Sequence, residues 1–581
     1  MHRETPKNIK IIINTMKKLT TFILAALASV SAVSAQQANA NVENVGPRNA
    51  MIRVSDDYKY LLFPIEEKAP ESHVRLMCDT KLEQTFTVRL AQEAVDYYMP
   101  LELEAFKGHK VLLDIREADF NVGHGIQPLW KDQICLSNTF DLNNTELWRP
   151  GFHHTPPYAW MNDPNGMFYD ETTQTWNLYY QWGPYDSKWN NMTWRHSTSK
   201  DLINWKDEGV AIAPNALGTI FSGSCVVDKE NTAGFGKGAV IALYTSAGDS
   251  QRQSLAYSTD GGKTFTNYAG NPVLAAGIPD FRDPNMFWNE KINAWNLILA
   301  AGQEMRIYSS PNLIDWKEES RFGLGYGNHG GVWECPDLLE VEVLDAQGKK
   351  TGKTKWVLIC NINPGGPFGG SATQYFVGSF DGHRFVCEDN AFESKWMDYG
   401  KDHYATVSFS GAPNGRKTVI AWMSNWEYAD AVPTKQFRSS NSIARDLFLY
   451  EAHGQTYLGS RPSPEYDNGV LNNIIKGADQ TIKVKGSGAW TLSNKYGEHV
   501  DIIYDDTACL LTVTRTKSGI QGFSAKFPAS TTAPVHRPLT SIRVIVDNAS
   551  IEVFGNNGEV CLTNLVFPQA PLTTLTANKK K

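Results

Sequence analysis

The sequence predicts an all-β protein, with a five-bladed β-propeller, a C-terminal β-sandwich and an additional small N-terminal β-domain. Apolar residues alternate with a period of two in both terminal parts of the chain, as half-buried strands require. Patterns of helical period are scarce throughout, which disfavours a (β/α)8 barrel. In the middle of the chain, a strand end, a polar turn and an aromatic residue recur together, as expected for the blades of a propeller.

Length and composition are those of a multidomain soluble protein. A chain of 581 residues is too long for one hydrophobic core and predicts roughly two to four domains. A hydrophobic content of 41% and a charged content of 20% are ordinary for a globular protein. The formal net charge of -7 at pH 7 argues against nucleic acid or an anionic membrane as a partner.

Residues 1–35 have the pattern of a secretory signal peptide. Lys17 and Lys18 precede an apolar run at residues 22–28, and Val33-Ser34-Ala35 supplies small residues for cleavage before Gln36. Met16 begins a more typical signal than the first methionine, so we expect it to be the true start. The signal predicts export across the inner membrane, to the periplasm or to the outside of the cell. No cysteine follows the cleavage site, which argues against a lipid anchor, and no transmembrane segment is predicted.

The eight cysteines are scattered and form no C-x-x-C pair. We therefore expect buried free thiols, with neither a disulfide framework nor a zinc site. Cys78 with Cys135 is the one pair that merits a test for a bridge.

The regions on either side of the middle of the chain predict two β-domains. Residues 36–147 alternate strongly, as Val74 and Leu76 illustrate, and contain no cluster that suggests catalysis. A role in packing against the next domain is favoured there over a sugar-binding role. In residues 453–577, Ile542, Val544 and Val546 alternate, and the later Asn-Asn-Gly at 556–558 indicates a hairpin.

Residues 148–452 contain the recurring pattern. His196–Trp205 and Tyr308–Trp316 are its clearest copies. The steps between copies are 61, 51 and 70 residues, counted between Ser197, Ser258, Ser309 and Ser379. Steps of this size, with several strands in each, fit about five blades into about 300 residues.

The stretch Trp160-Met161-Asn162-Asp163-Pro164-Asn165-Gly166 concentrates groups that suit a sugar. It leads into a short predicted strand, so Asp163 lies at a strand edge, with Pro164 stiffening the backbone and Gly166 allowing a tight bend. An aromatic plane, an amide and a carboxylate would lie together, although the same residues also suit a structural Asx-turn. Phe281–Asn285 repeats the Asp-Pro-Asn theme, and Trp333–Asp337 places a glutamate between an aromatic residue and Cys-Pro.

These three motifs, in this order, resemble glycoside hydrolase family 32, which contains invertases, inulinases and levanases. Other matching stretches, all in family order, are Gln181-Trp182, Phe221–Ser224, Asp398–Asp402 and Trp422–Trp426. The resemblance covers the chain from about residue 153 to near the C-terminus, and it also implies a five-bladed propeller followed by a β-sandwich. It leaves the first quarter of the chain unexplained.

The resemblance assigns roles to three carboxylates. Asp163 matches the nucleophile that forms a fructosyl-enzyme intermediate, Glu334 the general acid that later becomes the base, and Asp283 a transition-state stabiliser. The chemistry agrees, because an oxocarbenium-like transition state is positive and an ionised Asp163 would stabilise it. Two nearby aspartates should raise the pKa of Glu334 above its ordinary value of about 4.3, and Arg282 should keep Asp283 ionised.

The resemblance also implies a wider set of residues around the substrate. They are Trp160, Asn162, Gln181, Trp189, Phe221, Ser222, Arg282 and Trp426. Asp402 matches a polar position near the pocket, with a purely structural role as an equal alternative. His153 and His154 could suggest a metal, but no third ligand has a suitable spacing, so we expect strand residues at the rim of the funnel. The sequence predicts no metal and no cofactor.

The predicted function is a retaining β-fructosidase that hydrolyses levan or inulin, acts from chain ends to release fructose, and takes sucrose as a further substrate. The segment Trp422–Ala429 looks closer to fructan-degrading exo-enzymes than to sucrose invertases. The alternatives are a fructosyltransferase with the same intermediate, a sucrose-specific invertase and a non-enzymatic fructan-binding propeller. The presence of all three carboxylates argues against the last. An inverting five-bladed glycosidase of arabinans is a further rival, and the motifs around Asp163 and Glu334 argue against it.

Overall fold

The structure is a computed structural model that describes residues 37–46, 49–54, 57–117, 128–141 and 146–578. The predicted signal peptide lies outside these residues. The chain divides into two compact units, Met1–Asp141 and Leu142–Lys581. Within the described residues, no helix has the length and apolar character needed to cross a membrane.

The first unit is a small β-domain of two sheets, as predicted. Its elements are β1 (Gln37–Asn39), β2 (Asn41–Asn44), β3 (Asn49–Val54), β4 (Tyr60–Ile65), β5 (Ser72–Cys78), β6 (Lys81–Val88), β7 (Tyr97–Glu102), η1 (Glu104–Phe106), β8 (Val111–Arg116), α2 (Trp130–Gln133) and β9 (Cys135–Ser137). One sheet has the order β1-β9-β4-β7 and the other β2-β3-β8-β5-β6. Along β5, Val74 and Leu76 are buried while His73 and Arg75 are exposed, which is the alternation that the sequence predicted.

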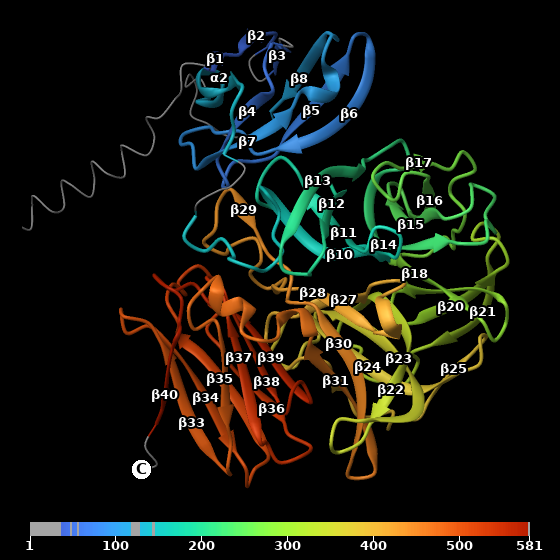
Figure 1. The fold of residues 1–581 in the computed structure, drawn as a ribbon. Helices are drawn as coiled ribbons and strands as arrows, with labels where there is room; N and C mark the ends of the chain where they lie inside the picture. Colours follow the sequence, from blue (N-terminus) through green and yellow to red (C-terminus); the bar gives the residue numbers. More distant parts are fainter. Residues whose placement is uncertain (1–36, 47–48, 55–56, 118–127, 142–145, 579–581) are drawn as a thin grey trace, which may run out of the picture. The chain divides into compact units, whose positions relative to one another are not determined.

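Five groups of antiparallel strands form the propeller of the second unit (Figure 1). Blade 1 has β10 (Ala159–Asp170), β11 (Thr175–Gly183), β12 (Thr193–Ser199) and β13 (Trp205–Ile212); blade 2 has β14 (Thr219–Asp228), β15 (Ala239–Ala247), β16 (Gln251–Ser258) and β17 (Thr266–Asn267); blade 3 has β18 (Phe281–Asn289), β19 (Ala294–Ala301), β20 (Met305–Ser310) and β21 (Lys317–Phe322). Blade 4 has β22 (Val332–Leu344), β23 (Lys350–Asn363), β24 (Ala372–Phe380) and β25 (Phe385–Cys387), with β26 (Lys395–Trp396) beside β24; blade 5 has β27 (Tyr404–Ser408), β28 (Thr418–Trp422), β30 (Arg445–Ala452) and β31 (Gln455–Pro462).

The first strands of the blades make a closed ring. Strands β10, β14, β18, β22 and β27 contact one another in turn, and β27 returns to contact β10. A short strand, β29 (Phe437–Arg438), also pairs in parallel with the start of β10. The ring brings residues that are far apart in the sequence to one central axis.

The recurring sequence pattern is the turn between the third and fourth strands of blades 1 to 4. In each copy one side-chain oxygen accepts hydrogen bonds from two backbone N–H groups shortly after it. The four acceptors are Asp201, Asp260, Asn312 and Asp381. Short polar side chains of this kind satisfy the backbone of a tight turn, which is why the pattern recurs once in each of these blades.

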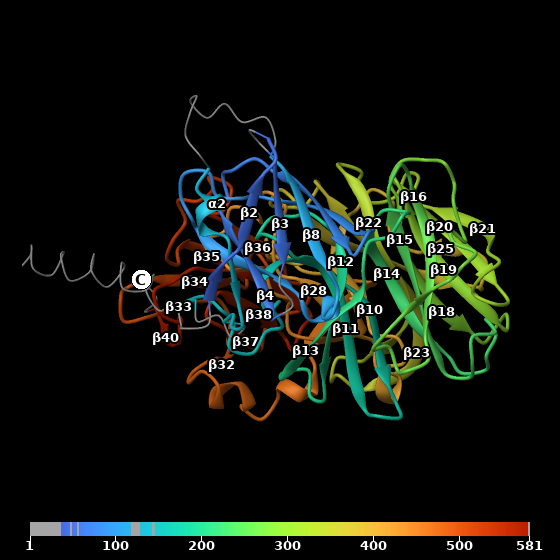
Figure 2. The ribbon, with the colours of Figure 1, turned by 90° about the horizontal axis from the view of Figure 1, so that it is seen from above.

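The C-terminal part is a β-sandwich, as predicted. Its strands are β32 (Asp479–Lys483), β33 (Gly488–Ser493), β34 (His499–Asp505), β35 (Leu510–Lys517), β36 (Ser530–Pro534), β37 (Ser541–Val546), β38 (Ser550–Gly555), β39 (Val560–Leu565) and β40 (Thr574–Ala577), and the short helices η2 (Pro413–Gly415), η3 (Pro464–Tyr466) and η4 (Val470–Asn473) precede them. The sheets β32-β37-β38-β39 and β36-β35-β34-β33-β40 enclose an apolar core that includes Ile502 and Val544. The sandwich lies to one side of the propeller (Figures 1 and 2).

A buried ionic cluster joins the propeller to the sandwich. The side chain of His153 is fully buried, with Nδ1 2.7 Å from Asp547 Oδ2 and Nε2 2.8 Å from Glu552 Oε1. Glu552 also pairs with Arg445, which lies 2.8 Å from Asp398. Burial alone would lower the pKa of His153, but the hydrogen bonds to the two carboxylates outweigh it and raise the pKa to about 9.

The expectation that His153 and His154 are strand residues at the rim of the funnel is wrong. Both are buried and precede the first strand of the propeller. His154 Nε2 lies 3.0 Å from Ser197 Oγ, and its Nδ1 lies 3.0 Å from Asn441 Nδ2. The two imidazoles therefore serve internal contacts.

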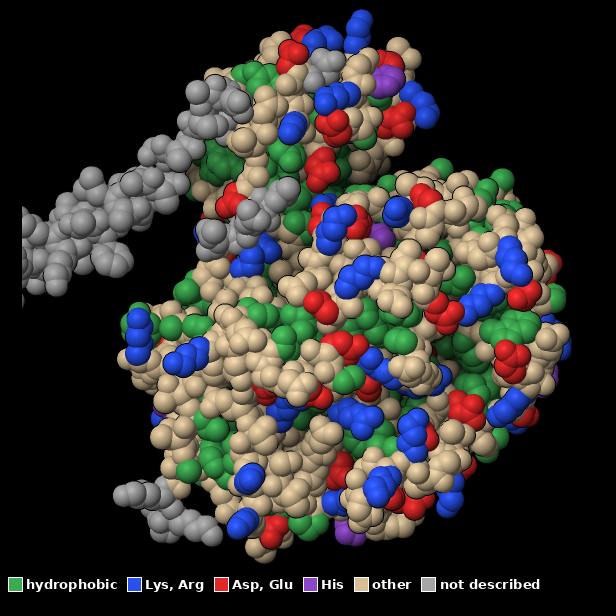
Figure 3. Space-filling view, viewed as in Figure 1, with side chains coloured by type: hydrophobic (Ala, Val, Ile, Leu, Met, Phe, Trp, Pro, Cys, Tyr) green, Lys and Arg blue, Asp and Glu red, His purple; other side chains and the backbone are tan. Residues whose placement is uncertain are grey.

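The cysteines are all free, so Cys78 and Cys135 form no bridge. The expectation of buried thiols is confirmed for half of them: Cys225, Cys335, Cys360 and Cys561. It is wrong for the others, because Cys78, Cys135 and Cys387 are partly buried and Cys509 is exposed. On the viewed face of the second unit, Lys and Arg are interspersed with Asp and Glu (Figure 3).

Candidate active site

The first strand of every blade is irregular at or next to a candidate site residue. The ladder register shifts between Met161 and Pro164 in β10, Ile220 and Gly223 in β14, Arg282 and Asn285 in β18, Glu334 and Asp337 in β22, and Tyr404 and Val407 in β27. A β-bulge redirects side chains that would otherwise alternate strictly. Asp283 and Cys335 adopt φ values of 64° and 40°, which are uncommon for residues other than glycine. The five bulges turn one group from each blade toward the centre of the ring.

Asp163 is held by donors from three different places. Asn162 Nδ2 donates to Asp163 Oδ1 at 3.0 Å, and Ser222 Oγ donates to Oδ2 at 2.7 Å. The Cys335 thiol lies 3.3 Å from the same Oδ2. Several donors on one carboxylate stabilise its negative charge and restrict its orientation. Asp163 is therefore oriented by blades 1, 2 and 4 together.

Asp283 is linked to Asp163 through Cys335. The Cys335 backbone N–H donates to Asp283 Oδ2 at 2.9 Å, and its thiol lies 3.6 Å from the same oxygen. Burial raises the pKa of Asp283 to about 7, against the charge of Arg282 and with the help of Glu334 and Asp163. Arg282 does lower the pKa of Asp283, as the sequence suggested, but burial outweighs it, so the arginine alone does not keep Asp283 fully ionised at neutral pH.

Glu334 is the main partner of Arg282. Arg282 Nη2 and Nε donate to Glu334 Oε1 at 2.8 and 3.2 Å, while Nε lies 3.9 Å from Asp283 Oδ2. The other oxygen, Glu334 Oε2, accepts a hydrogen bond from Tyr404 Oη. Burial and the charge of Glu334 raise the pKa of Tyr404 well above its ordinary value, so the phenol remains a donor. Asp280 and Gln251 hold Arg282 Nη1 at 2.5 and 3.1 Å.

Aromatic residues form a wall next to Asp163. Trp160 is fully buried; its indole N–H donates to Asn162 Oδ1 at 2.8 Å, and its ring stacks on Trp426 with centroids 5.8 Å apart. Trp426 is only partly buried. Trp189 is 45% exposed and packs edge-on against Phe221 at 5.9 Å. Partly exposed rings beside carboxylates suit the apolar face of a sugar.

Gln181 lies in β11 opposite the bulge that contains Asn162 and Asp163. Its side chain is 2% exposed, and its Nε2 has no hydrogen-bond partner among the described residues. An unpaired buried amide donor is costly unless a ligand completes it. The predicted site residues from the three motifs thus lie in one interlinked group with Ser222, and Gln181 lies on the adjacent strand.

Asp402 belongs elsewhere. It is fully buried, and its carboxylate accepts hydrogen bonds from Tyr428 Oη at 2.5 Å, from the backbone N–H of Leu565 at 2.8 Å and from Arg515. These partners bind the propeller to the sandwich, so the structural interpretation of Asp402 is the one that its contacts favour.

Sequence reasoning missed two features of the site. One is the hydrogen bond from Tyr404 to Glu334, and the other is the position of Cys335 between Asp163 and Asp283. Tyr404 begins the first strand of blade 5, two residues after Asp402, the polar residue that the sequence offered there. The fivefold arrangement of first strands was the signal that could have directed attention to it.

Comparison with known proteins identifies the family. The profile described as glycosyl hydrolases family 32 N-terminal domain matches residues 153–462, and the family 32 C-terminal profile matches residues 476–581. The chain belongs to glycosyl hydrolase family 32. A profile described as a domain of unknown function matches residues 46–152 of this family 32 enzyme.

Named relatives and a solved structure agree with this assignment. The family 32 enzyme is 40% identical over 459 residues to a levanase of Bacillus subtilis, covering 73% of this chain and 67% of that one. It is 38% identical over 474 residues to an extracellular exo-inulinase of Meyerozyma guilliermondii, covering 73% and 90%. A β-fructofuranosidase of Schwanniomyces occidentalis, solved with fructosyl-erythritol, superposes with a TM-score of 0.67 at 33% identity, covering 76% and 97%. The chain is a glycoside hydrolase, as predicted.

Proposed function

We propose that this enzyme is a retaining β-fructosidase that hydrolyses fructans through a fructosyl-enzyme intermediate. The observation that carries the proposal is the position of Cys335, which follows Glu334 in the chain. Its thiol lies near both Asp163 and Asp283, and its backbone N–H donates to Asp283. Three carboxyl groups from three blades are thereby held around one small site. Relatives named levanase and exo-inulinase support fructan as the substrate.

In the proposed first step, a carboxylate oxygen of Asp163 attacks the anomeric carbon of the terminal fructose. The bond from that carbon to the glycosidic oxygen breaks, and the leaving oxygen takes a proton from Glu334. Water then attacks the same carbon and gives a proton to Glu334, and the ester to Asp163 breaks. Two successive displacements leave the anomeric configuration unchanged.

Asp283 has a binding role in this proposal. A hydroxyl of fructose that donates to its carboxylate would favour the ionised form, and so oppose the raised pKa that burial gives this carboxyl. Gln181 would donate its unpaired amide N–H to another hydroxyl. The substrate site would be completed by the other residues that the family resemblance suggested. They are Trp160, Asn162, Trp189, Phe221, Ser222, Arg282 and Trp426.

We extend the proposal to the position of cleavage and to export. Action at chain ends is supported by the exo-inulinase named among the relatives. Export is supported by the signal pattern of residues 1–35 and by a relative described as extracellular. We propose an N-terminal domain at 36–147 and a sandwich that ends at 577, and we move the boundary between propeller and sandwich from 452 to 462, because β31 pairs with β30 in blade 5.

A chromatographic time course on levan, inulin and sucrose, run side by side with the purified protein, tests the function. We expect fructose alone from the earliest time on one of the two polymers, and the faster polymer names the linkage. A ladder of oligosaccharides would contradict action at chain ends. Products larger than sucrose at high sucrose concentration would favour the transferase, activity confined to sucrose would favour an invertase, and no release from any of the three would overturn the proposal.

A further inference from the structure

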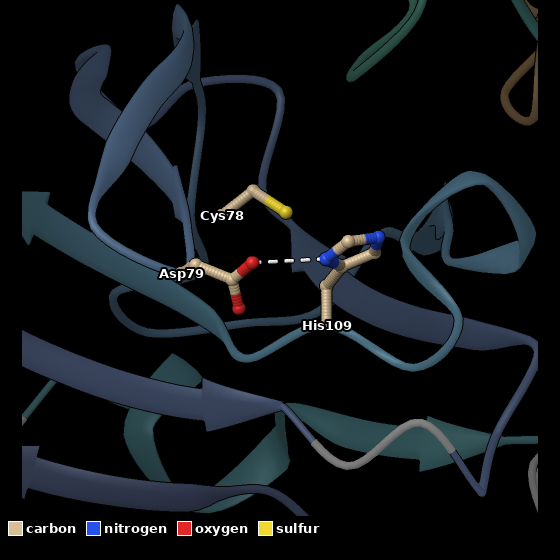
Figure 4. A group of neighbouring side chains, drawn as sticks. All are labelled: Cys78, Asp79 and His109. Carbon is tan, nitrogen blue, oxygen red and sulfur yellow. Dashed lines mark hydrogen bonds and ion pairs between the residues drawn. The ribbon is translucent and has the colours of Figure 1, made fainter.

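Three side chains that can bind a metal meet at one end of the N-terminal β-domain. Cys78 ends β5, Asp79 follows it in the turn to β6, and His109 lies just before β8. The sulfur, a carboxylate oxygen and a ring nitrogen lie within 4.8 Å of one another. Figure 4 shows these groups pointing toward one another, with His109 Nδ1 2.9 Å from Asp79 Oδ2.

The backbone holds the two segments in place. Strand β5 pairs with β8, with Cys78 opposite Val111. The Asp79 N–H donates to the Lys110 carbonyl oxygen at 2.7 Å, and the Lys110 N–H donates to Asp79 Oδ1 at 3.0 Å. These two hydrogen bonds hold the turn after β5 against the segment before β8. The backbone positions of the three residues are therefore fixed relative to one another. Second contacts of this kind orient carboxylate ligands.

The three donors together favour zinc. A thiolate, an imidazole and a carboxylate are the ligands that Zn²⁺ takes in proteins, whereas Ca²⁺ and Mg²⁺ prefer oxygen alone. Tetrahedral zinc with bonds of about 2.0–2.3 Å places its ligand atoms about 3–4 Å apart, so a movement of about 1 Å is enough. The side chains of Asp79 and His109 are 56% and 53% exposed, which leaves room for a water as the fourth ligand.

This group differs from other histidine–carboxylate pairs on the surface. His383 pairs with Glu319, and His499 lies 3.9 Å from Asp501, but neither pair is part of a three-ligand group. Among the described residues, Cys78, Asp79 and His109 form the one group of three histidine, cysteine or acidic side chains that could hold an ion. The sequence predicted no metal site, because Cys78 and His109 are far apart along the chain and the pairing of β5 with β8 was not foreseen.

We propose that Cys78, Asp79 and His109 bind one Zn²⁺ ion, with water as the fourth ligand. An ion bound to Asp79 Oδ2 and His109 Nδ1 replaces the hydrogen bond between them. The ion also cross-links the turn after β5 to the segment before β8, in addition to the two backbone hydrogen bonds. The site gives the N-terminal domain a metal-dependent property that the glycosidase reaction does not use.

Titration of the full-length protein with Co²⁺ tests the site, because Co²⁺ replaces zinc and a thiolate ligand gives it a strong near-ultraviolet absorption. We expect this absorption to saturate at one equivalent of Co²⁺ and to disappear when one equivalent of Zn²⁺ is added. Cys78→Ser and His109→Gln should each lower the apparent affinity at least about tenfold. Cys509→Ser, which removes an exposed cysteine of the sandwich, is the matched control and should titrate unchanged.

A second measurement needs no variant. Zn²⁺ should slow the alkylation of Cys78 in the unmodified protein at least about tenfold, as followed by peptide mass spectrometry, and leave Cys509 unaffected. The proposal is overturned if the native protein shows no thiolate absorption with Co²⁺, if Cys78→Ser retains it, or if Zn²⁺ protects both cysteines equally.

Discussion

Tyr404 is the clearest case of one side chain acting on the chemistry through another. Its phenol donates to the Glu334 oxygen that Arg282 does not hold. Hydrogen bonds to charged groups contribute about 1.5–3 kcal/mol, so Tyr404→Phe should lower kcat about 10- to 100-fold and change KM little. The pH–rate profile should also change, because one hydrogen bond to the catalytic carboxyl groups is lost. Steady-state kinetics on the preferred fructan between pH 4 and 8 give both results.

Tyr504→Phe is the control for this change. Tyr504 also donates to a carboxylate, that of Asp506 at 2.5 Å, but it lies in the sandwich. We expect its kinetics to match those of the native enzyme. An unchanged kcat and pH profile in Tyr404→Phe would show that Tyr404 does not act on the reaction through Glu334.

Glu334→Gln tests the general acid directly. The amide cannot give a proton to the leaving oxygen, so kcat on fructan should fall about 10²- to 10⁴-fold. Glu340→Gln, in the same strand β22 but bonded to Thr354, should leave the rate unchanged. Undiminished release of fructose by Glu334→Gln would show that the acid is another residue.

The sequence motifs predicted where single residues lie in the fold better than they predicted which side chains those residues contact. The three carboxylates were placed correctly on three central strands, because each lies in a local sequence pattern. The partners of Arg282 were not, because Glu334 is brought to it by the closure of the ring and the pKa of Asp283 depends on burial.

At the scale of the element, the bulge in β14 explains why Gly223 follows Ser222. A Cβ atom on Gly223 would lie 2.0 Å from the Leu243 carbonyl oxygen and 2.7 Å from Tyr244 Cα, both in the neighbouring strand β15. Gly223→Ala should therefore push β14 from β15 and reduce the free energy of unfolding by about 1–3 kcal/mol. The displaced Ser222 would also lose its bond to Asp163 and lower kcat. Urea denaturation and steady-state kinetics measure the two effects.

Gly522→Ala is the matched substitution, because a Cβ atom there meets nothing within 4 Å and the glycine has no positive φ. It should change the free energy of unfolding by less than about 0.5 kcal/mol. Equal stabilities for the two variants would contradict the steric account of the bulge.

The elements also show why the blades could be foreseen from the sequence. The Asx-type turns at Asp201, Asp260, Asn312 and Asp381 are local, so they leave a repeated trace in the chain. The bulges leave no such trace, because each is defined by its register against a neighbouring strand.

At the scale of the whole second unit, His153 links stability to pH. Its raised pKa means that the folded state holds a proton more tightly than the unfolded chain, so the contribution is complete below about pH 6.5. It is lost as the pH rises toward 9. For a fully buried group this amounts to about 3 kcal/mol.

Denaturant midpoints of the native protein and of His153→Gln, measured from pH 6.5 to 9, test this link. The native enzyme should lose stability across this range relative to the variant, which should be less stable at pH 6.5. His499→Gln, in strand β34 of the sandwich, should follow the native curve. If the stabilities of the native protein and of His153→Gln changed in parallel with pH, the raised pKa of His153 would be contradicted.

The junction also marks the limit of sequence reasoning at this scale. The separate propeller and sandwich could be predicted from alternation and turns. Their contact could not, because His153 meets Asp547 and Glu552 nearly 400 residues later, with no local pattern on either side.

Double displacement through Asp163 and Glu334 is tested most directly by the configuration of the product formed in dilute methanol. Methanol competes with water for the fructosyl-enzyme, and the methyl fructofuranoside that results cannot mutarotate. Nuclear magnetic resonance of this product from the preferred substrate should show the β-anomer alone. The α-anomer would contradict a retaining mechanism.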